Sequence, residues 1–400
     1  MILVEYYEQP AVVLGLYVNG IGTIRSLAED RKIRILGVGG KNEIGMASKY
    51  LYKGYSLKNS IDSSELLYIL ETIRDTYGNA IIIPTGSDFW VKFLVDNGER
   101  LSPIKVFYRN DTLDVMRKSY QIELARKLGI PCPLTREIKN LEQLEDASRA
   151  LVSPYVIKPV SRNTKKERFR IKVLTTNTQL IDTLAPLISL GEEYVVSELV
   201  PGDDSNLYTY GSYANNGKVI REFYGRKLTQ IPSDFGVVGT AESLESIPGL
   251  KIQSEKLLSE INFTGISQIE YKFDERTNEY KLIEINPRSW MWANLASACG
   301  VNLPLAQYYF ETGREDLLRK VGKRTVRHLY FINGTSILYN MFLERRFKSL
   351  RILLKSQLCG KVTYAIHSFA DPKPAIKDMI SKFALIRRIP NKIFRKGSCS

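Results

Sequence analysis

The sequence has few of the residues that build zinc sites, disulfide frameworks or histidine-dependent catalysis. Its 400 residues include four cysteines and two histidines. The cysteines are scattered without CxxC spacing, and neither His328 nor His367 lies beside a serine or cysteine nucleophile motif. Structural zinc needs clustered cysteine or histidine ligands, and a catalytic triad needs a histidine base. We therefore expect the chemistry to rest on carboxylates, lysines, arginines and a hard metal ion.

Glycine-rich phosphate motifs are also missing. No GxxxxGK[ST] sequence occurs, which excludes a P-loop. Gly20 and Gly22 follow the first expected strand, but the complete GxGxxG pattern is absent. Dinucleotide binding is therefore disfavoured.

Long apolar runs are absent as well. None reaches the roughly 18 residues that a membrane-spanning helix needs. The first ten residues, which include Glu5 and Glu8, lack the basic and then apolar pattern of a signal peptide. With 44% hydrophobic and 25% charged residues, the composition is that of a globular protein. We therefore expect a cytoplasmic location.

Positive charge is concentrated towards the C-terminus. The formal net charge is +14, and residues 341–400 carry 14 Lys or Arg against three acidic residues. In residues 342–358, apolar residues are interspersed with five Lys or Arg. Such a basic amphipathic helix suits peripheral contact with an anionic membrane. Packing on the core with a solvated basic face, and attraction of a phosphate-rich acceptor, are open alternatives. Nucleic acid is not expected, because no recognition motif occurs.

The first 112 residues alternate between apolar strands and helices. Fully apolar strands that alternate with helices indicate a parallel sheet covered on both faces. The expected strands are 11–16, 33–38 and 80–84, and the expected helices are 20–29, 66–77 and 88–95.

The middle of the chain has a different pattern. Residues 111–128 have the periodicity of one amphipathic helix, which Gly129 and the turn 131–133 close. The short strands beyond it predict α+β structure with an antiparallel sheet, to about residue 290. The first three of these strands are expected at 155–159, 170–175 and 193–200.

The most informative pattern is a predicted hairpin with two glutamates. Strands 268–274 and 279–288 are joined by a short polar turn. Glu270 lies seven residues before Thr277, and Glu284 lies seven residues after it. The two carboxylates are therefore expected to face each other across the hairpin.

Residues on the second strand extend this pair. Side-chain alternation places Glu284, Asn286 and Arg288 on one face. Two facing carboxylates repel each other unless a cation lies between them, and with an amide oxygen they form an all-oxygen set that suits Mg²⁺. Arg288 would then face the charge on a transferred phosphoryl group. The alternative is that both glutamates are solvated residues on an ordinary hairpin.

This hairpin resembles that of the ATP-grasp superfamily, in particular its carboxylate–amine ligase branch with a carbamoyl-phosphate-synthetase-like core. The resemblance extends from about residue 10 to about residue 315, and Glu-Ile-Asn-Pro-Arg is its most specific part. It implies that Glu270 and Glu284 bind metal and that Asn286 completes a second metal site. By the same resemblance, Arg288 stabilises the transferred phosphate. The implied cofactors are ATP and two Mg²⁺ ions, and replacement by Mn²⁺ is left open.

Three lysines have counterparts among the family's phosphate-binding groups. Lys158 ends an apolar strand, where the family places a phosphate-binding lysine, and a surface charge is the alternative. Lys118 matches a lysine that often precedes this turn in the family. The alternative is that Lys118 is a solvated lysine on a helix face. The family often has a glycine-rich flap over the phosphates, but residues 161–168 contain no glycine. Lys172 can supply a replacement charge.

A strand followed by Pro-Gly resembles the family's adenine hinge. Backbone groups of Leu199 and Val200 would bind the adenine edge, and Glu198 would lie beside the adenine. Asp203 or Asp204 would lie near the ribose hydroxyls.

Two adjacent cations, Arg226 and Lys227, resemble the family's cationic strand that points at the reacting groups. We expect one of the two to contact phosphate or the substrate carboxylate, and a solvated pair is the alternative. The loop 234–239 is expected to shape the acceptor pocket.

The predicted fold class is therefore mixed α/β and α+β, with the ATP-grasp fold, in which ATP lies between the lid and the metal-binding sheet. The predicted divisions are a Rossmann-like domain at 1–112, a lid subdomain at 113–197, a metal-binding and catalytic subdomain at 198–330 and a basic extension at 331–400.

The predicted activity is an ATP-dependent ligase that activates a carboxylate as an acyl phosphate and joins it to an amine. Small-molecule carboxylates and amines are the expected substrates, and a phosphate-rich envelope precursor is a further candidate. A homodimer is left open. The alternative function is an ATP-binding scaffold or regulator without turnover.

Overall fold

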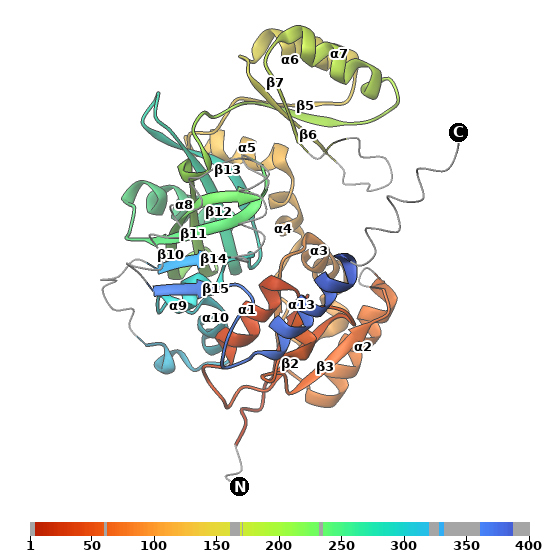
Figure 1. The fold of residues 1–400 in the computed structure, drawn as a ribbon, viewed down its shortest axis with the longest axis vertical. Helices are drawn as coiled ribbons and strands as arrows, with labels where there is room; N and C mark the ends of the chain where they lie inside the picture. The colour runs from red at the N-terminus through yellow and green to blue at the C-terminus, as the bar shows by residue number, and fades with distance from the viewer. Residues whose placement is uncertain are drawn as a thin grey trace.

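The computed structural model consists of three stacked units (Figure 1). The N-terminal domain lies at one end, a small sheet with two helices lies at the other, and a large sheet lies between them. The predicted mixture of α/β and α+β structure is confirmed. The described residues are 5–59, 62–160, 169, 171–231, 235–319, 328–331 and 361–386.

The N-terminal domain contains β1 (Ala11–Leu14), α1 (Val18–Leu27), β2 (Ile35–Gly40), η1 (Ile44–Ala47), β3 (Lys53–Leu57), α2 (Ser63–Tyr77), β4 (Ile81–Pro84), α3 (Asp88–Asn97) and η2 (Glu99–Leu101). Its strands are parallel, in the order β3-β2-β1-β4. Ala11 and Val13 of β1 belong to one buried core with α1, whereas Val12 and Leu14 belong to another with α2 and α3. The predicted parallel sheet covered on both faces is confirmed.

The small sheet and its helices comprise β5 (Thr135–Ile138), α6 (Leu141–Ala150), β6 (Tyr155–Pro159), β7 (Lys172–Leu174), α7 (Asn177–Ile188) and β8 (Tyr194–Glu198). The strands are antiparallel, in the order β5-β8-β6-β7. Both helices pack on one face, where Tyr155 and Ile157 of β6 are buried. Side chains 156 and 158 therefore point to the other face, on the side of the large sheet (Figure 1).

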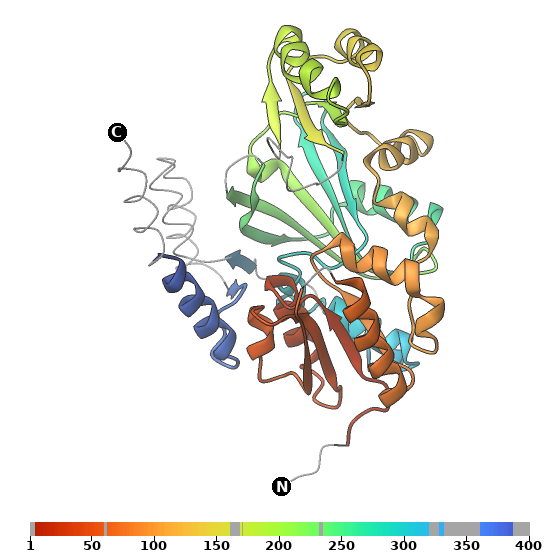
Figure 2. The same ribbon diagram turned by 90° about the vertical axis from the view of Figure 1, so that its right-hand side faces the viewer.

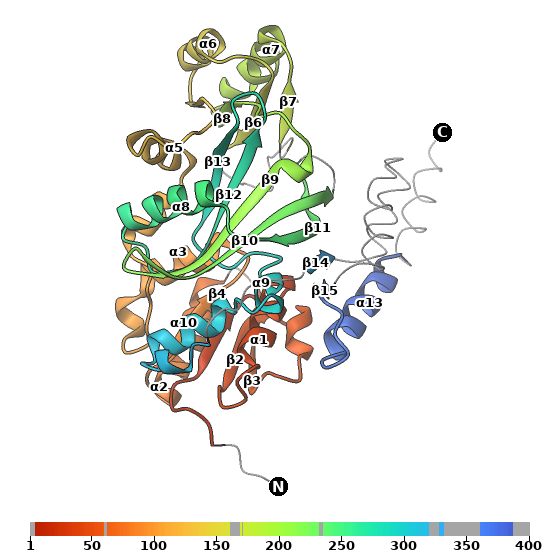
Figure 3. The same cartoon turned by 90° about the vertical axis from the view of Figure 1, so that its left-hand side faces the viewer.

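The large sheet comprises β9 (Leu207–Asn215), β10 (Lys218–Ile231), β11 (Val237–Leu244), β12 (Gly265–Asp274), β13 (Glu279–Asn286), β14 (His328–Phe331) and β15 (Lys361–Tyr364). Its order is β13-β12-β9-β10-β11-β14-β15, and among the described strands β14 and β15 pair in parallel while the other neighbours are antiparallel. Helices α5 (Lys118–Lys127) and α8 (Pro248–Glu260) cover one face. Figure 3 shows the long strands between the small sheet and the N-terminal domain.

The predicted helix at 111–128 is interrupted. The structure has α4 (Asn110–Val115) and then α5, with Arg117 between them in an extended conformation. Gln121 Nε2 donates a hydrogen bond to Val115 O at 2.7 Å and so satisfies a carbonyl at the end of α4. The break redirects the chain, so that α4 packs beside α3 and α5 beside β13.

This packing moves the boundary of the lid. Helix α5 contributes Leu124 and Ala125 to the core under the large sheet, whereas the small sheet begins at Thr135. The predicted lid at 113–197 therefore divides between two units. The last strand of the small sheet, β8, ends at Glu198, and the predicted division of the chain stays a prediction.

Part of the predicted C-terminal extension packs on the rest of the protein. β15 completes the large sheet, and α13 (Lys373–Ile386) follows it along the N-terminal domain (Figure 2). Asp371 is buried and accepts hydrogen bonds from Arg25 Nε at 3.2 Å and Ser48 Oγ at 2.8 Å. The predicted amphipathic helix at 342–358 lies outside the described residues. No helix in the described ranges is long and apolar enough to cross a membrane.

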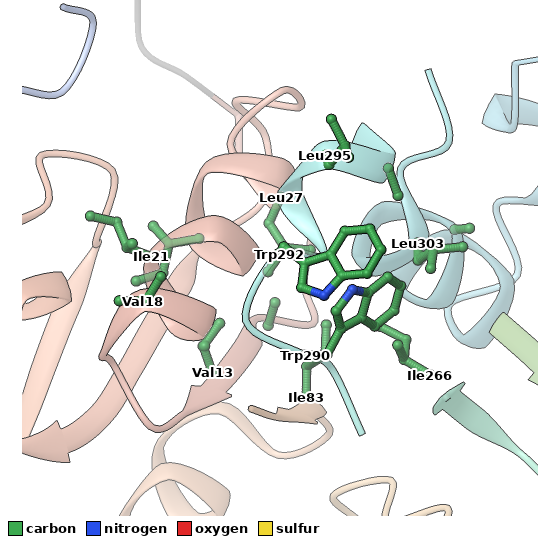
Figure 4. Close-up of a cluster of buried hydrophobic side chains, with 14 of the residues drawn as sticks. Val13, Val18, Ile21, Leu27, Ile83, Ile266, Trp290, Trp292, Leu295 and Leu303 are labelled. Carbon is green, nitrogen blue, oxygen red and sulfur yellow. The ribbon is translucent and has the colours of Figure 1, made fainter. Parts of the chain in front are cut away.

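The N-terminal domain and the large sheet share one core. After β13, Trp290 and Trp292 pack among Val13 of the N-terminal domain and Ile266 of the large sheet (Figure 4). A Cβ atom at Gly211 of β9 would lie 2.2 Å from Trp290 Cη2, so only glycine leaves room for this ring. This core fixes the end of β13 against the N-terminal domain. It also includes residues of α9 (Asn294–Ala298) and α10 (Leu303–Glu311), which precede η4 (Glu315–Leu317).

Candidate active site

The β12-β13 hairpin places Glu270 directly opposite Glu284. If the register near the turn continued without interruption, Glu270 would lie opposite Ile283. A bulge at Ile283 shifts the register by one residue and brings the two glutamates onto one face. Leu282 and Ile285, on either side of the bulge, both point into the core on the opposite face. The prediction that the two carboxylates face each other is confirmed.

Helix α5 and the turn after it cover the outer edge of β13. Gln121 Oε1 accepts a hydrogen bond from Ile285 N at 3.1 Å, and Gln121 Nε2 donates to Ile285 O at 2.9 Å. Leu282 N donates to Pro131 O at 2.7 Å. These bonds supply partners to the backbone of an edge strand. They also hold Lys118, the first residue of α5, beside the hairpin.

Each glutamate is paired with a lysine from another element. Lys118 Nζ lies 2.6 Å from Glu284 Oε1, and Lys227 Nζ lies 2.7 Å from Glu270 Oε1. Gly225 of β10 lies in line with Glu270 across β9, and Lys227 follows two residues later on the same face. The side chains of Lys227 and Glu270 are 11% and 12% exposed, so this pair is largely shielded from water.

A third lysine, Lys158, reaches the hairpin from the small sheet. Its neighbour Ile157 points into the core under α6 and α7, so Lys158 points the other way, towards the large sheet. Burial lowers the pKa of Lys158, as do the charges of Lys118 and Lys227, whereas the two glutamates act in the opposite direction. Lys158 therefore lies within the electrostatic range of both ion pairs.

Asn286 and Arg288 continue the site towards the N-terminal domain. Asn286 Nδ2 donates to Gln268 Oε1 at 3.4 Å, and Asn286 Oδ1 accepts from Arg288 Nη2 at 3.3 Å. Arg288 Nε donates to Asp88 Oδ1 at 2.6 Å, at the first residue of α3. Arg288 is thus held between the end of β13 and the N-terminal domain.

The surrounding cations keep Glu284 ionised. Burial raises its pKa, but the charges of Lys118 and Lys158, the hydrogen bond from Lys118 and the charge of Arg288 together lower it to about 2. Counting Lys227 and Asp88, four cations accompany three carboxylates. This excess of positive charge suits a polyanion such as a polyphosphate.

The oxygen atoms at the site fit Mg²⁺ only if a ligand adds more of them. Within the described ranges, no group of three or more His, Cys, Asp or Glu residues could hold a metal ion. Glu270, Glu284 and Asn286 offer two carboxylates and one amide, the kind of set that Mg²⁺ uses when phosphates and waters complete its coordination. The donors therefore suit a Mg²⁺ ion that arrives with a polyphosphate, and the number of ions stays a prediction.

Of the two predicted strand cations, only Lys227 faces the hairpin carboxylates. Arg226 points to the opposite face of the large sheet, where it pairs with Glu242 and its Nη1 lies 3.5 Å from Tyr208 Oη. Neighbouring residues of a strand alternate in direction, so both could not face the same ligand. Arg226 is therefore removed from the candidate site.

Lys172 does not lie with Lys158. It pairs with Ile157 across β6 and β7, which places it on the helix-covered face of the small sheet. Its Nζ lies 3.4 Å from Thr183 Oγ1 of α7. The expectation that Lys172 supplies a phosphate-binding charge is corrected, because its position in the sheet directs it away from the carboxylates.

The predicted adenine hinge is bonded to the small sheet. Glu198 Oε1 accepts a hydrogen bond from Val152 N at 3.1 Å, and Leu199 N donates to Pro154 O at 2.8 Å. Val200 is buried. The N–H of Leu199 therefore already has a partner, and the adenine contacts of Glu198, Leu199 and Val200 stay predictions.

The two aspartates after the hinge differ. Asp203 caps η3 (Asp204–Asn206), and its Oδ1 accepts from Ser205 N at 2.8 Å. Asp204 is buried and accepts from both Gln230 N and Gln230 Nε2 at 2.8 Å. Asp204 therefore joins η3 to β10, and of the two only Asp203 remains a candidate for the ribose. The flap 161–168 and Asp234 of the predicted acceptor loop lie outside the described residues.

Three polar residues of the site were not predicted. Gln268 lies two residues before Glu270, so side-chain alternation in the strand could have identified it. Gln121 lies three residues after Lys118, on the same side of a helix, and could have been found in the same way. Asp88 carries no sequence signal, because its link to the site depends on the packing of two domains.

Solved structures place this architecture in a known class. N5-carboxyaminoimidazole synthetase from Staphylococcus aureus, complexed with ADP, matches with a TM-score of 0.65 and 13% identity, over 85% of this chain and 87% of that chain. L-amino acid ligase from Bacillus licheniformis matches with a TM-score of 0.58 and 13% identity, over 78% of each chain. This chain has the ATP-grasp fold. The resemblance seen in its sequence is therefore confirmed for the fold.

A sequence comparison adds one more specific similarity. Over 113 residues, the chain is 29% identical to a D-aspartate ligase from Enterococcus faecium (strain Aus0004). The match covers 28% of this chain and 27% of that ligase, so it spans little more than a quarter of the relative. No protein-family model matches the sequence.

Proposed function

We propose that this protein is an ATP-dependent carboxylate–amine ligase that releases ADP and phosphate. The observation that carries the proposal is the pairing of Glu270 with Glu284 on one face of a hairpin, beside three lysines from other elements. Such a group of charges suits the phosphates of a nucleotide with Mg²⁺. The ATP-grasp fold and the similarity to named ligases support the same activity.

Each residue has a role that follows from its position. Glu270, Glu284 and Asn286 would hold Mg²⁺, while Lys158, Lys118 and Lys227 would neutralise phosphate oxygens after leaving the carboxylates. When bound, ATP supplies the phosphoryl group that activates the substrate carboxylate. Arg288, at the junction with the N-terminal domain, would hold the transferred group beside the substrate.

The substrates are proposed from the similarity to D-aspartate ligase. We propose a small amino acid, with D-aspartate as the first candidate, as the activated carboxylate, and an amine of a second small molecule as the acceptor. The same proposal has four finer parts. They are two metal ions, an envelope precursor as acceptor, a homodimer, and a cytoplasmic location with membrane contact through 342–358.

The test is phosphate release from Mg²⁺-ATP in the presence of D-aspartate, other amino acids, sugar acids and a panel of amines. Glu284→Gln removes one metal-binding carboxylate and leaves its shape, so release is expected to fall about 100-fold or more. Circular dichroism is expected to be unchanged.

Glu279→Gln is the matched control, because Glu279 lies on the same strand and is exposed. Its activity is expected to equal that of the unmodified protein. Equal rates for the Glu284 and Glu279 variants would remove Glu284 from the mechanism. Binding of Mg²⁺-ATP without release for any substrate would favour the scaffold or regulator.

A further inference from the structure

Helix α13 packs on the rest of the protein partly through polar groups. Asp371, just before the helix, is buried in the N-terminal domain. Lys377 Nζ donates to the backbone oxygen of Glu43 at 2.9 Å, and Asp378 is buried and paired with Lys382 at 2.6 Å. The inner side of α13 therefore combines hydrogen bonds to the N-terminal domain with apolar packing of Ala375 against the buried core.

The outer side of the same helix is apolar. Ile376, Met379 and Ile380 follow at the spacing of one helix face and are 49%, 51% and 62% exposed. Phe369, in the turn before the helix, is fully exposed. A surface helix normally buries its apolar side and solvates its polar side. In α13 these three apolar side chains are exposed while Asp378 is buried, which indicates a partner for the outer side.

The charged residues of α13 that reach the surface are lysines, whereas Glu43 of the adjacent N-terminal domain is half-buried. In residues 361–386, the two acidic residues are Asp371 and Asp378, and both are buried. Lys373 is exposed at the start of α13, and Lys41 and Lys49 are exposed on the neighbouring N-terminal domain. Exposed apolar side chains, with lysines on the same helix and on the segment bonded to it, are complementary to a layer that is anionic outside and apolar beneath.

We propose that Phe369 and the outer side of α13 dock this protein on an anionic lipid surface. The apolar side chains enter the boundary between headgroups and acyl chains, and the lysines face anionic headgroups. Figure 2 shows α13 at the periphery of the molecule, beside the N-terminal domain and away from the small sheet. Docking through this side leaves the hairpin site of Glu270 and Glu284 free, so the proposal does not depend on the proposed function.

Other partners fit these observations less well. A stable dimer interface uses roughly 20–30 residues a side, far more than four apolar side chains. A nucleic acid would be met by basic and hydrogen-bonding groups rather than by exposed Ile and Met side chains. A lipid surface needs only a small apolar insertion combined with positive charge.

The test is co-sedimentation of the full chain with two kinds of vesicle, phosphatidylcholine alone and phosphatidylcholine mixed with phosphatidylglycerol. Binding is expected to the mixed vesicles, with loss at high salt. Ile376→Ser/Ile380→Ser and Phe369→Ser are each expected to weaken binding about tenfold or more. Ile252→Ser is the matched control, because Ile252 is a 66% exposed isoleucine on the distant helix α8, and it is expected to bind like the unmodified chain.

Three results would overturn the proposal. The first is the absence of binding to mixed vesicles, with a loss of thermal stability in the outer-face variants, because another part of this chain would then cover the surface. The second is a dimer that Ile376→Ser/Ile380→Ser converts to a monomer, which would assign the surface to a second copy. The third is equal loss of binding in the Ile252 variant, because the effect would then not be specific to α13.

Discussion

The β12-β13 hairpin carries a group of carboxylates and cations at each end, and the two groups differ in the origin of their partners. At the turn, Asp274 accepts hydrogen bonds from Arg276 Nη2 at 2.9 Å and Lys281 Nζ at 2.8 Å. All three residues belong to the same hairpin. At the other end, Glu270 and Glu284 meet lysines from α5, β6 and β10.

The difference separates a structural group of charges from a binding site. Asp274 has no exposed side-chain surface, and its partners satisfy it within the turn. At the site, burial and then the charges of Lys118 and Lys227 lower the pKa of Lys158, which means that like charges are held together away from water. Such an arrangement costs free energy until an anion binds. Convergence of like charges from separate elements is therefore the stronger sign of a ligand.

The difference between the two ends of the hairpin is tested most directly by removing one lysine from each end. Lys158→Met is expected to lower the phosphate release rate about 100-fold, because a phosphate-neutralising charge is lost. Its thermal stability is expected to stay equal or rise, because the folded protein disfavours the charged lysine. A clear loss of stability with activity retained would assign Lys158 a structural role.

Lys281→Met is the counterpart at the turn. It leaves the buried Asp274 with fewer partners, so the free energy of unfolding is expected to fall by about 2 kcal/mol in urea denaturation. Its phosphate release rate is expected to match that of the unmodified protein. If both variants lose activity equally, the two ends of the hairpin do not differ as proposed.

The sequence predicted the facing glutamates, but for an incomplete reason. Counting from Thr277 gave the correct pair, whereas the register at the turn leads Glu270 to Ile283. The bulge at Ile283 supplies the missing residue, and a bulge has no reliable signal in a single sequence. Counting alone was therefore fortuitous, and the metal-binding role that the family resemblance implies for this pair stays a prediction.

The lysines show where prediction from sequence stops. Lys158 ends an apolar strand, so its direction follows from alternation once Ile157 is known to be buried. The choice between Arg226 and Lys227, and the direction of Lys172, depend on which residues lie across the sheet. Those pairings are set by tertiary packing, which local patterns do not contain.

A smaller effect is expected from the contact between the hairpin and the N-terminal domain. Asp88→Asn weakens the bond that positions Arg288, so kcat is expected to fall about tenfold with little change in the KM for ATP. Asp96→Asn is the matched control, because Asp96 forms an exposed pair with Lys92 on the same helix. A rise in the KM for ATP with kcat unchanged would mean that Asp88 acts on nucleotide binding instead.

The smallest expected effect is a pH dependence at the turn. Hydrogen bonds from Arg276 lower the pKa of Asp274 against the effect of burial, and Lys281 acts in the same direction as Arg276. A carboxyl with a lowered pKa stabilises the fold above its ordinary pKa of about 3.9, and this contribution is lost as the pH falls below that value. Asp274→Asn is therefore expected to be less stable than the unmodified protein at pH 6, by about 1 kcal/mol. This difference should shrink towards pH 3 in urea denaturation. A difference that stays constant across this range would show that the charge of Asp274 does not stabilise the turn, and the distinction between the two ends of the hairpin would then rest on the site alone.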